Sequence, residues 1–253
     1  MCAAHKGRLN IFPIGVVGVT AEGDFADARC FTSLDGASFA RSGSSFTTLK
    51  LQNGWTQASG SARPGVRLID GIVHFRGAIN IGSSTALFTL PKAFRPDKAV
   101  YVPVDLCQAQ NGRLVIQPSG QVQVQVGRLF SDAQCATSLD GASFAKSGTS
   151  FTPLTLKNGW TNTKYGTAHA AGRVISGIVH LRGAVATTGS SPVPFILPKA
   201  LRPASSVYVP VDLCGARYGR LVIRPTGVVG VSAERSFSDA QCFTSLDGVV
   251  FAR

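Results

Sequence analysis

Six cysteines are the residues whose spacing most clearly indicates a chemistry. They fall into three pairs whose members lie 28 positions apart: Cys2 with Cys30, Cys107 with Cys135, and Cys214 with Cys242. We expect one disulfide per pair, each stabilising the fold by roughly 3.5 kcal/mol on a chain-entropy argument. Pairs of small buried thiols are the alternative, and a zinc site is disfavoured because no Cys-x-x-Cys or paired histidine completes a ligand set. Disulfides would indicate an oxidising compartment.

Histidine and arginine recur together on a predicted strand. The sequence Gly-Ile-Val-His-Phe/Leu-Arg-Gly-Ala occurs twice in the chain. Because successive side chains of a strand point to opposite faces, His74 shares a face with Arg76, and His180 shares a face with Arg182. These four residues are candidate contacts to a polar ligand or another subunit. The alternative is a solvent-facing or hydrogen-bonded strand surface.

Two tryptophans are the third candidate type. Trp55 and Trp160 each follow an Asn-Gly dipeptide, which is a turn signal. An exposed tryptophan there could stack on the apolar face of a sugar, with polar neighbours fixing its orientation. The alternative is that a tryptophan found once per repeat anchors the core.

The acidic residues do not form a catalytic pattern. Most recur at turn-like positions, such as the Ser-Leu-Asp-Gly tetrapeptides that contain Asp35, Asp140 and Asp247, or the repeated Asp105 and Asp212. No Asp-rich loop for calcium, no nucleophile elbow, no His-Glu-x-x-His and no phosphate-binding loop occurs in the sequence. We therefore expect a protein without enzymatic activity, metal or cofactor.

The candidate residues recur because the chain repeats itself. The segment 7–41 returns at 112–146 and at 219–253, and 23 of 35 positions are identical between the last two segments. The segment 42–111 likewise returns at 147–218.

This self-similarity predicts the domain organisation. We expect a partial copy (1–41), a first complete copy (42–146) and a second complete copy (147–253). A unit of about 105 residues is too long for a solenoid repeat and has the size of a domain. Each complete copy should therefore bury its own core.

Composition and strand patterns predict an all-β fold. Only two Glu occur, Gly is 28 residues, and charged residues make up 15% of the chain. Short alternating strands are separated by turn signals such as Pro225-Thr226-Gly227, and no segment shows a sustained helical period. Pro103 and Pro210 fall inside predicted strands, which favours sheet edges or bulges there. About seven strands per unit indicate tandem β-sandwich repeats of the jelly-roll type.

The formal net charge of +12 favours anionic partners, such as wall polymers, acidic polysaccharides or lipid head groups. Its alternative role is to keep a sparsely charged surface soluble. The basic residues are scattered and no nucleic-acid recognition motif occurs, so we do not expect nucleic-acid binding. No apolar stretch reaches the roughly 18 to 20 residues that a membrane helix needs. The apolar run near the N-terminus recurs in the other copies, so we assign it to the repeat and not to a signal peptide.

The repeated motifs resemble a known protein family. They are Asn-Gly-Trp-Thr, Gly-Ile-Val-His-Phe/Leu-Arg-Gly-Ala, Leu-Pro-Lys-Ala-x-Arg-Pro, Val-Tyr-Val-Pro-Val, Gly-Arg-Leu-x-Ile-x-Pro-x-Gly and Ser-Leu-Asp-Gly-x-x-Phe. Together they look like the β-sandwich modules at the distal ends of phage and prophage tail fibres and receptor-binding proteins of Gram-positive and actinobacterial hosts. The resemblance implies attachment of a virion to host-surface glycans, commonly as a homotrimer. It covers nearly the whole chain, and its motifs are turn and core residues, which specify fold more than function.

The functional hypothesis is a virion-associated or tail-associated structural protein that binds a host-surface glycan or anionic wall polymer through several weak sites. Its expected partners are copies of itself, as in a homotrimer, or other virion proteins. Two alternatives remain: a capsid or tail decoration protein without ligand binding, and a secreted bacterial lectin or adhesin. All three place the protein in a virion or outside the cell.

Overall fold

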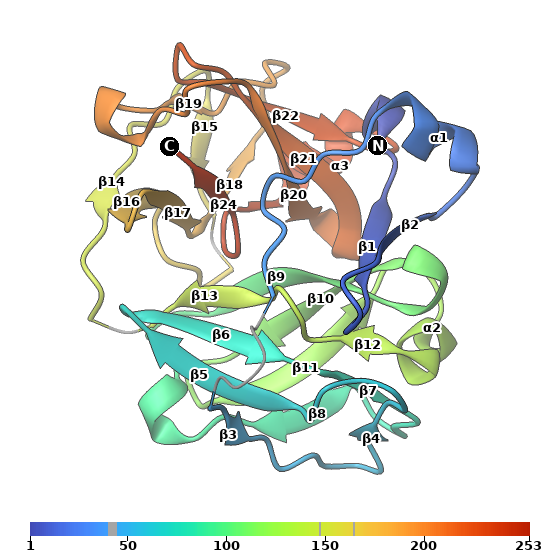
Figure 1. Cartoon of the computed structure of the whole chain (residues 1–253). Helices are drawn as coiled ribbons and strands as arrows, with labels where there is room; N and C mark the ends of the chain where they lie inside the picture. Colours follow the sequence, from blue (N-terminus) through green and yellow to red (C-terminus); the bar gives the residue numbers. More distant parts are fainter. Residues whose placement is uncertain (40–44, 147, 164) are drawn as a thin grey trace.

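The computed structural model describes residues 1–39, 45–146, 148–163 and 165–253 (Figure 1). The fold is all-β, as predicted. The predicted boundaries between the copies, at 41/42 and 146/147, involve residues outside the described ranges and stay predictions.

The partial copy forms a short hairpin followed by one helical turn and a half. Its elements are η1 (Cys2–Ala4), β1 (Gly7–Ile11), β2 (Val17–Ala21) and α1 (Phe25–Cys30). Strands β1 and β2 pair only with each other in the described part of the chain, as a two-stranded antiparallel sheet.

Within residues 45–146, the first complete copy contains eleven strands in three sheets. Its elements are β3 (Thr47–Thr48), β4 (Thr56–Gln57), β5 (Gly65–Ile69), β6 (Ile72–Arg76), β7 (Ala78–Asn80), β8 (Ala86–Thr89), η2 (Lys92–Phe94), β9 (Val100–Asp105), η3 (Cys107–Ala109), β10 (Asn111–Ile116), β11 (Gln121–Val126), α2 (Phe130–Cys135), β12 (Thr137–Ser138) and β13 (Ser143–Ala145). The sheet orders are β8-β11-β10-β9, β12-β7-β4 and β13-β6-β5-β3.

The second complete copy has the same order of elements. They are β14 (Thr152–Pro153), β15 (Trp160–Asn162), β16 (Ala171–Ile175), β17 (Ile178–Arg182), β18 (Ala184–Thr187), β19 (Phe195–Ile196), η4 (Lys199–Leu201), β20 (Val207–Leu213), η5 (Cys214–Ala216), β21 (Arg217–Ile223), β22 (Val228–Ala233), α3 (Phe237–Cys242), β23 (Thr244–Ser245) and β24 (Val250–Ala252). Its sheets are β14-β16-β17-β24 and the seven-stranded β15-β18-β23-β20-β21-β22-β19.

The described residues of the first complete copy form three sheets and those of the second form two, and a single residue pairing accounts for the difference. Strand β20 extends to Leu213, which pairs with Thr244 and joins two sheets into one. The corresponding contact in the first complete copy, Leu106 with Thr137, is an isolated bridge. The two copies therefore share one strand arrangement.

The core consists of two hydrophobic clusters, and each draws all its members from one complete copy. The first cluster lies within residues 49–144 and the second within 154–251. Each cluster takes side chains from more than one sheet of its copy, such as Val73 of β6 and Leu114 of β10 in the first, and Val179 of β17 and Leu221 of β21 in the second. Each complete copy thus has the two-layer core of a sandwich.

Several local predictions are confirmed. In β17 the alternate residues Val179 and Leu181 are buried. Pro103 lies in β9, which is an edge strand, and Pro210 lies where β20 is paired on one side only. Gly227 has φ +87° in the turn between β21 and β22, a conformation that suits glycine.

One kind of element was not predicted. Each copy contains a six-residue α-helix, α1, α2 or α3, whose last residue is a cysteine. Six residues are less than two helical turns, which is too short to produce a recognisable apolar periodicity.

Candidate functional site

The two tryptophans lie inside the cores, so their proposed stacking on a sugar needs correction. Trp55 is 4% exposed and Trp160 is 3% exposed. Their ring N–H groups donate to the main-chain oxygens of Ser84 and Ser191, both at 2.8 Å. Each ring packs edge-on against a phenylalanine of the following helix. Because no ring face is free, we assign both residues to the core.

The repeated arginines contact phenylalanine residues near the beginning of each complete copy. The Arg76 guanidinium lies 4.5 Å from the ring centre of Phe46, and that of Arg182 lies 4.6 Å from the ring centre of Phe151. Arg182 also donates to the main-chain oxygen of Thr149 at 3.0 Å. These contacts are cation–π interactions and a hydrogen bond within the copy, so both side chains already have structural partners.

The repeated histidines are half-buried at the junction between the complete copies. Burial lowers the pKa of His74 and lowers that of His180 to about 4, and the charge of His74 contributes to the second shift. This influence of His74 on His180 indicates that the two rings lie near each other. Both are uncharged at neutral pH. They and the two arginines therefore lie on a strand face that other parts of the chain partly cover.

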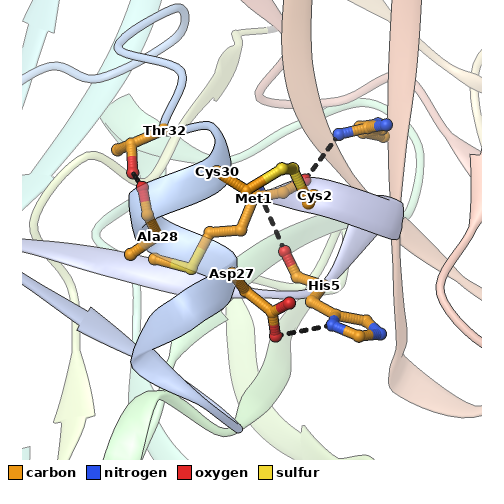
Figure 2. Close-up of a disulfide and its surroundings, with 8 residues drawn as sticks. Met1, Cys2, His5, Asp27, Ala28, Cys30 and Thr32 are labelled. Carbon is orange, nitrogen blue, oxygen red and sulfur yellow. Dashed lines mark hydrogen bonds and ion pairs between the residues drawn. A yellow bond between two sulfur atoms is a disulfide. The ribbon is translucent and has the colours of Figure 1, made fainter.

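All six cysteines form the expected disulfides. The Cα atoms are 5.9 Å apart for Cys2–Cys30 and 5.6 Å apart for each of the other two pairs. Each bond connects the short 3-10 helix of a copy to its α-helix. Figure 2 shows the first of them beside the contact between His5 Nδ1 and Asp27 Oδ2, which are 2.7 Å apart.

The three copies also contact one another through charged side chains. Between the partial and first complete copies, Lys6 Nζ and Arg8 Nη1 lie 2.8 Å and 2.9 Å from the two carboxylate oxygens of Asp105. Lys6 Nζ also donates to the main-chain oxygens of Ala109 and Gln110. Desolvation of this buried ammonium lowers the pKa of Lys6, although Asp105 opposes the shift.

The corresponding arginine joins the two complete copies. Arg113 Nη1 lies 2.7 Å from Asp212 Oδ2, and the guanidinium lies 4.9 Å and 5.6 Å from the rings of Tyr101 and Phe243. Asp212 is fully buried, and burial raises its pKa to about 7 although Arg113 opposes this. The direction is physically reasonable, because the other carboxylate oxygen of Asp212 has no hydrogen-bond partner.

A second contact between the complete copies uses the Ser-Leu-Asp-Gly turn. Ser245 Oγ donates to the main-chain oxygen of Tyr101 at 2.6 Å. Asp247 accepts from the main-chain N–H of Gly183 at 2.9 Å. Burial raises its pKa to about 7, although this N–H and that of Tyr101 oppose the shift.

The third junction joins the second complete copy to the partial copy. Asp35 Oδ2 accepts from the main-chain N–H of Tyr208 at 3.0 Å, and the Phe31 and Tyr208 rings are 4.9 Å apart. Arg220 Nη1 donates to the main-chain oxygen of Met1 at 2.7 Å. Arg220 thus occupies the place of Arg8 and Arg113 but meets a carbonyl instead of a carboxylate.

These junctions connect equivalent positions in a cyclic order. Arg8, Arg113 and Arg220 each lie six positions after the first cysteine of their copy, and each reaches into the next copy around the cycle. Head-to-tail contacts of this kind form a ring when the rotation between copies closes. The chain therefore closes a ring of three copies, with β1 and β2 beside both complete copies (Figure 1).

A polar hollow of about 600 Å³ opens where the two complete copies meet. It is lined by Asp70 and Gly71 of the first copy, by residues 148–150, and by Arg173 to Ser176 of the second copy. Arg173 pairs in register with His180, so the hollow lies beside the strand that carries one candidate histidine.

The sequence analysis missed the ion pairs between copies. Asp105 and Asp212 recur two positions before a cysteine, where the sequence predicts turns. They lie in fact at or near the ends of strands β9 and β20. The recurrence of one Asp and one Arg at fixed distances from the same cysteine was the only signal of a shared role.

Within the described ranges, no group of three or more His, Cys, Asp or Glu side chains could hold a metal ion. The same residues contain no helix that is long and apolar enough to cross a membrane. Comparison with models of known protein families, with curated proteins and with solved structures found no match.

Proposed function

We propose that this protein is a non-enzymatic attachment protein of a virion or tail, which displays its copies as a ring and binds a glycan or anionic polymer on the host surface. The observation that carries the proposal is the cyclic order of equivalent contacts made by Arg8, Arg113 and Arg220. A ring of related modules presents related surfaces in a fixed orientation, and weak sites held in this way gain avidity.

The charge distribution supports an anionic ligand. The chain carries a formal net charge of +12, and its most buried carboxylates, Asp212 and Asp247, face the interior of the ring junctions. Exposed basic side chains such as Lys92 and Lys199 recur at corresponding positions of the complete copies. Such a surface attracts polyanions, and the attraction weakens as salt screens it.

The polar hollow is the place where we expect the ligand to bind. It combines a cation, Arg173, with main-chain and hydroxyl groups of residues 148–150 and with Asp70. Cation and hydroxyl groups of this kind bind the hydroxyls and anionic groups of a glycan.

The test is binding of the full chain to a glycan array and to whole bacterial cells at low and at moderate salt. Arg173→Glu should lower binding about tenfold or more, since one lost charged contact costs at least about 1.4 kcal/mol. Lys157→Glu makes the same charge change at an exposed position outside the hollow and is the matched control. A blank array and no cell binding at low salt would contradict the proposal.

A decoration role without ligand binding is the second candidate, and the exposed apolar residues of the partial copy favour it. In that case the chain should co-sediment with isolated capsids or tails, and Arg173→Glu should leave this association unchanged.

A further inference from the structure

The partial copy carries an unusual concentration of exposed apolar side chains. Of the 15 large hydrophobic residues that are exposed in the described part of the chain, 8 lie in its first 39 residues. They are Ile11, Phe12, Ile14, Val16, Val17, Phe25, Leu34 and Phe39. We call this set the open face. An exposed apolar surface of this kind marks a contact with another molecule or another part of a protein.

Corresponding residues of the complete copies show what the open face is. Ile11 is 41% exposed, whereas Ile116 and Ile223 are 0% exposed. Leu34 is 66% exposed, whereas Leu139 and Leu246 are 0% exposed. Val17 and Phe39 follow the same rule, with buried counterparts in both complete copies. These four residues of the open face are therefore one half of a sandwich core, whereas Phe12, Ile14 and Val16 lie at turn positions that are not buried in the complete copies.

The other half is known from the complete copies. There the strands equivalent to β1 and β2 are flanked by further strands: β9 pairs with β10, and β8 pairs with β11. Strands β6 and β7 pair with β13 and β12, which follow the α-helix. All four covering strands come from residues 72–105, the part of the unit that precedes the first cysteine. In the partial copy both outer edges of β1–β2 lack ladder partners within the described ranges.

Two polar contacts point to the same part of the unit. Arg8 and Arg113 pair with Asp105 and Asp212, which lie two positions before the first cysteine of their copies, whereas Arg220 Nη1 donates to the Met1 carbonyl. A segment with the repeat pattern would place an aspartate beside Arg220.

The second polar contact concerns the Ser-Leu-Asp-Gly turn. Asp35 accepts from the main-chain N–H of Tyr208 in a neighbouring copy, and the N–H of Tyr101 lies close enough to Asp247 to oppose the rise of its pKa. Asp140 accepts from Gly77 of its own copy, and its neighbour Gly141 faces Ser38 of the partial copy. The tyrosine that would donate to Asp140 belongs to the part of the unit that covers the open face in a complete copy.

We propose that the open face binds a polypeptide segment with the sequence pattern of residues 45–106, supplied by another chain that carries this repeat. The segment adds strands to both edges of β1–β2, covers the apolar side chains and brings an aspartate to Arg220. Main-chain hydrogen bonds at the sheet edges give affinity, and the apolar pockets give specificity, as in other cases of strand addition. A second copy of this chain fits less well, because each of its covering segments already closes a core of its own.

The experiment mixes the full chain with residues 45–106 expressed on a soluble carrier protein. We expect a complex of one segment per chain by light scattering. Amides of β1, β2 and residues 31–39 should exchange at least about tenfold more slowly in the complex, because an edge that gains ladder hydrogen bonds opens less often.

Matched variants test the two parts of the contact. Ile11→Asp in the full chain should weaken binding more than tenfold, since it places a charge in the new core, and the free chain should still fold because Ile11 is exposed. Ile81→Asp changes an exposed apolar residue outside the open face and should have no effect. In the segment, Asp105→Asn should weaken binding several-fold if Arg220 receives this carboxylate.

Three results would overturn the proposal. They are the absence of a complex at tens of micromolar segment, equal binding by Ile11→Asp and Ile81→Asp, and a full chain that is already dimeric with slowly exchanging β1 and β2. A chain in which residues 45–106 are fused directly before Cys2 tests whether this segment fits the open face when it is covalently attached. If the fusion protects β1 and β2 but the separate segment does not bind, another chain is not the source.

Discussion

Arg113 and Asp212 form the most buried ion pair between the copies, and their position makes it costly to break. The Arg113 side chain is 13% exposed and that of Asp212 is 0% exposed, whereas Arg8 in the equivalent pair is 32% exposed. Removing one partner of a buried pair leaves an uncompensated charge, while a more exposed pair contributes little. Two arginines at the same place in the repeat therefore have different energetic roles.

We predict that Arg113→Ala lowers the free energy of unfolding by about 3 to 5 kcal/mol. Arg8→Ala should lower it by at most about 1 kcal/mol, because Lys6 still pairs with Asp105. Urea denaturation of the two variants and the unsubstituted chain measures the difference. Equal losses would show that burial does not distinguish the two junctions.

His180 makes stability dependent on pH. Its pKa is lowered to about 4 in the folded chain and is close to 6.5 in the unfolded chain. Between these values the unfolded chain binds more protons, so this residue's contribution to stability is complete above pH 6.5 and is lost as the pH falls to about 4.

We therefore predict that His180→Gln loses less stability than the unsubstituted chain when the pH falls from 7 to 4. The difference should reach about 1 to 2 kcal/mol, after allowance for the solvent that reaches the ring. His74→Gln should change stability in the same direction, because burial also lowers the pKa of His74. Thermal unfolding across this pH range measures the effect, and parallel pH profiles of variant and unsubstituted chain would contradict it.

At the scale of elements, one glycine allows the chain to pass from one sheet to the other. Gly183 lies between β17 and β18, which belong to different sheets. It has φ +91°, and a Cβ atom there would lie 2.5 Å from the main-chain oxygen of Ala168. Its N–H donates to Asp247 at 2.9 Å and its carbonyl accepts from Leu246 at 2.8 Å. The two hydrogen bonds fix the bend, and the close approach of the Ala168 oxygen leaves no room for a side chain at position 183.

Gly183→Ala should destabilise the fold by about 3 kcal/mol, because strain at positive φ adds to a clash with backbone. Gly177→Ala is the control, since Gly177 has φ +81° with nothing within 4 Å of its Cβ position. It should cost only about 1 kcal/mol from the left-handed conformation. Chemical denaturation of both variants measures the costs, and equal values would remove the steric explanation.

Strand periodicity and turn residues made many of the strands and turns predictable from the sequence. Val179 and Leu181 alternate with His180 in the sequence and in the burial of β17. The short helix α3 was not predictable in the same way, because its six residues are defined by the Ser236 cap and the disulfide at Cys242. Its formation depends on contacts that a local pattern does not contain.

At the scale of the molecule, the partial copy closes the ring and so should stabilise both neighbours. It contacts the first complete copy through Asp105 and the second through Tyr208 and the contact of Glu234 with the Lys6 N–H. Without the partial copy, Asp105, Tyr208 and Glu234 would become more exposed to solvent.

Deletion of residues 1–41 should leave both complete copies folded, because their hydrophobic clusters are separate. Amides near Tyr208 and in residues 105–110 should exchange faster, and the melting temperature should fall by several degrees, since an effect of about 1 kcal/mol moves it by about 2 to 4 °C at this size. Hydrogen exchange with mass spectrometry makes the comparison. Unchanged exchange at these sites would mean that the partial copy does not close the ring.

The amino-acid sequence alone determined the fold class, the turns and the three cysteine pairs, because each depends on short-range spacing or on recurrence along the chain. Only the tertiary structure decided which repeated residues are equivalent in role. Asp105 and Asp212 occupy the same place in the repeat, yet Asp212 is sealed between two complete copies and Asp105 retains contact with solvent. Trp55, an open candidate for ligand binding in the sequence, became a core residue once the sheets closed over it. Burial depends on what lies across a junction, and a linear pattern does not carry that information.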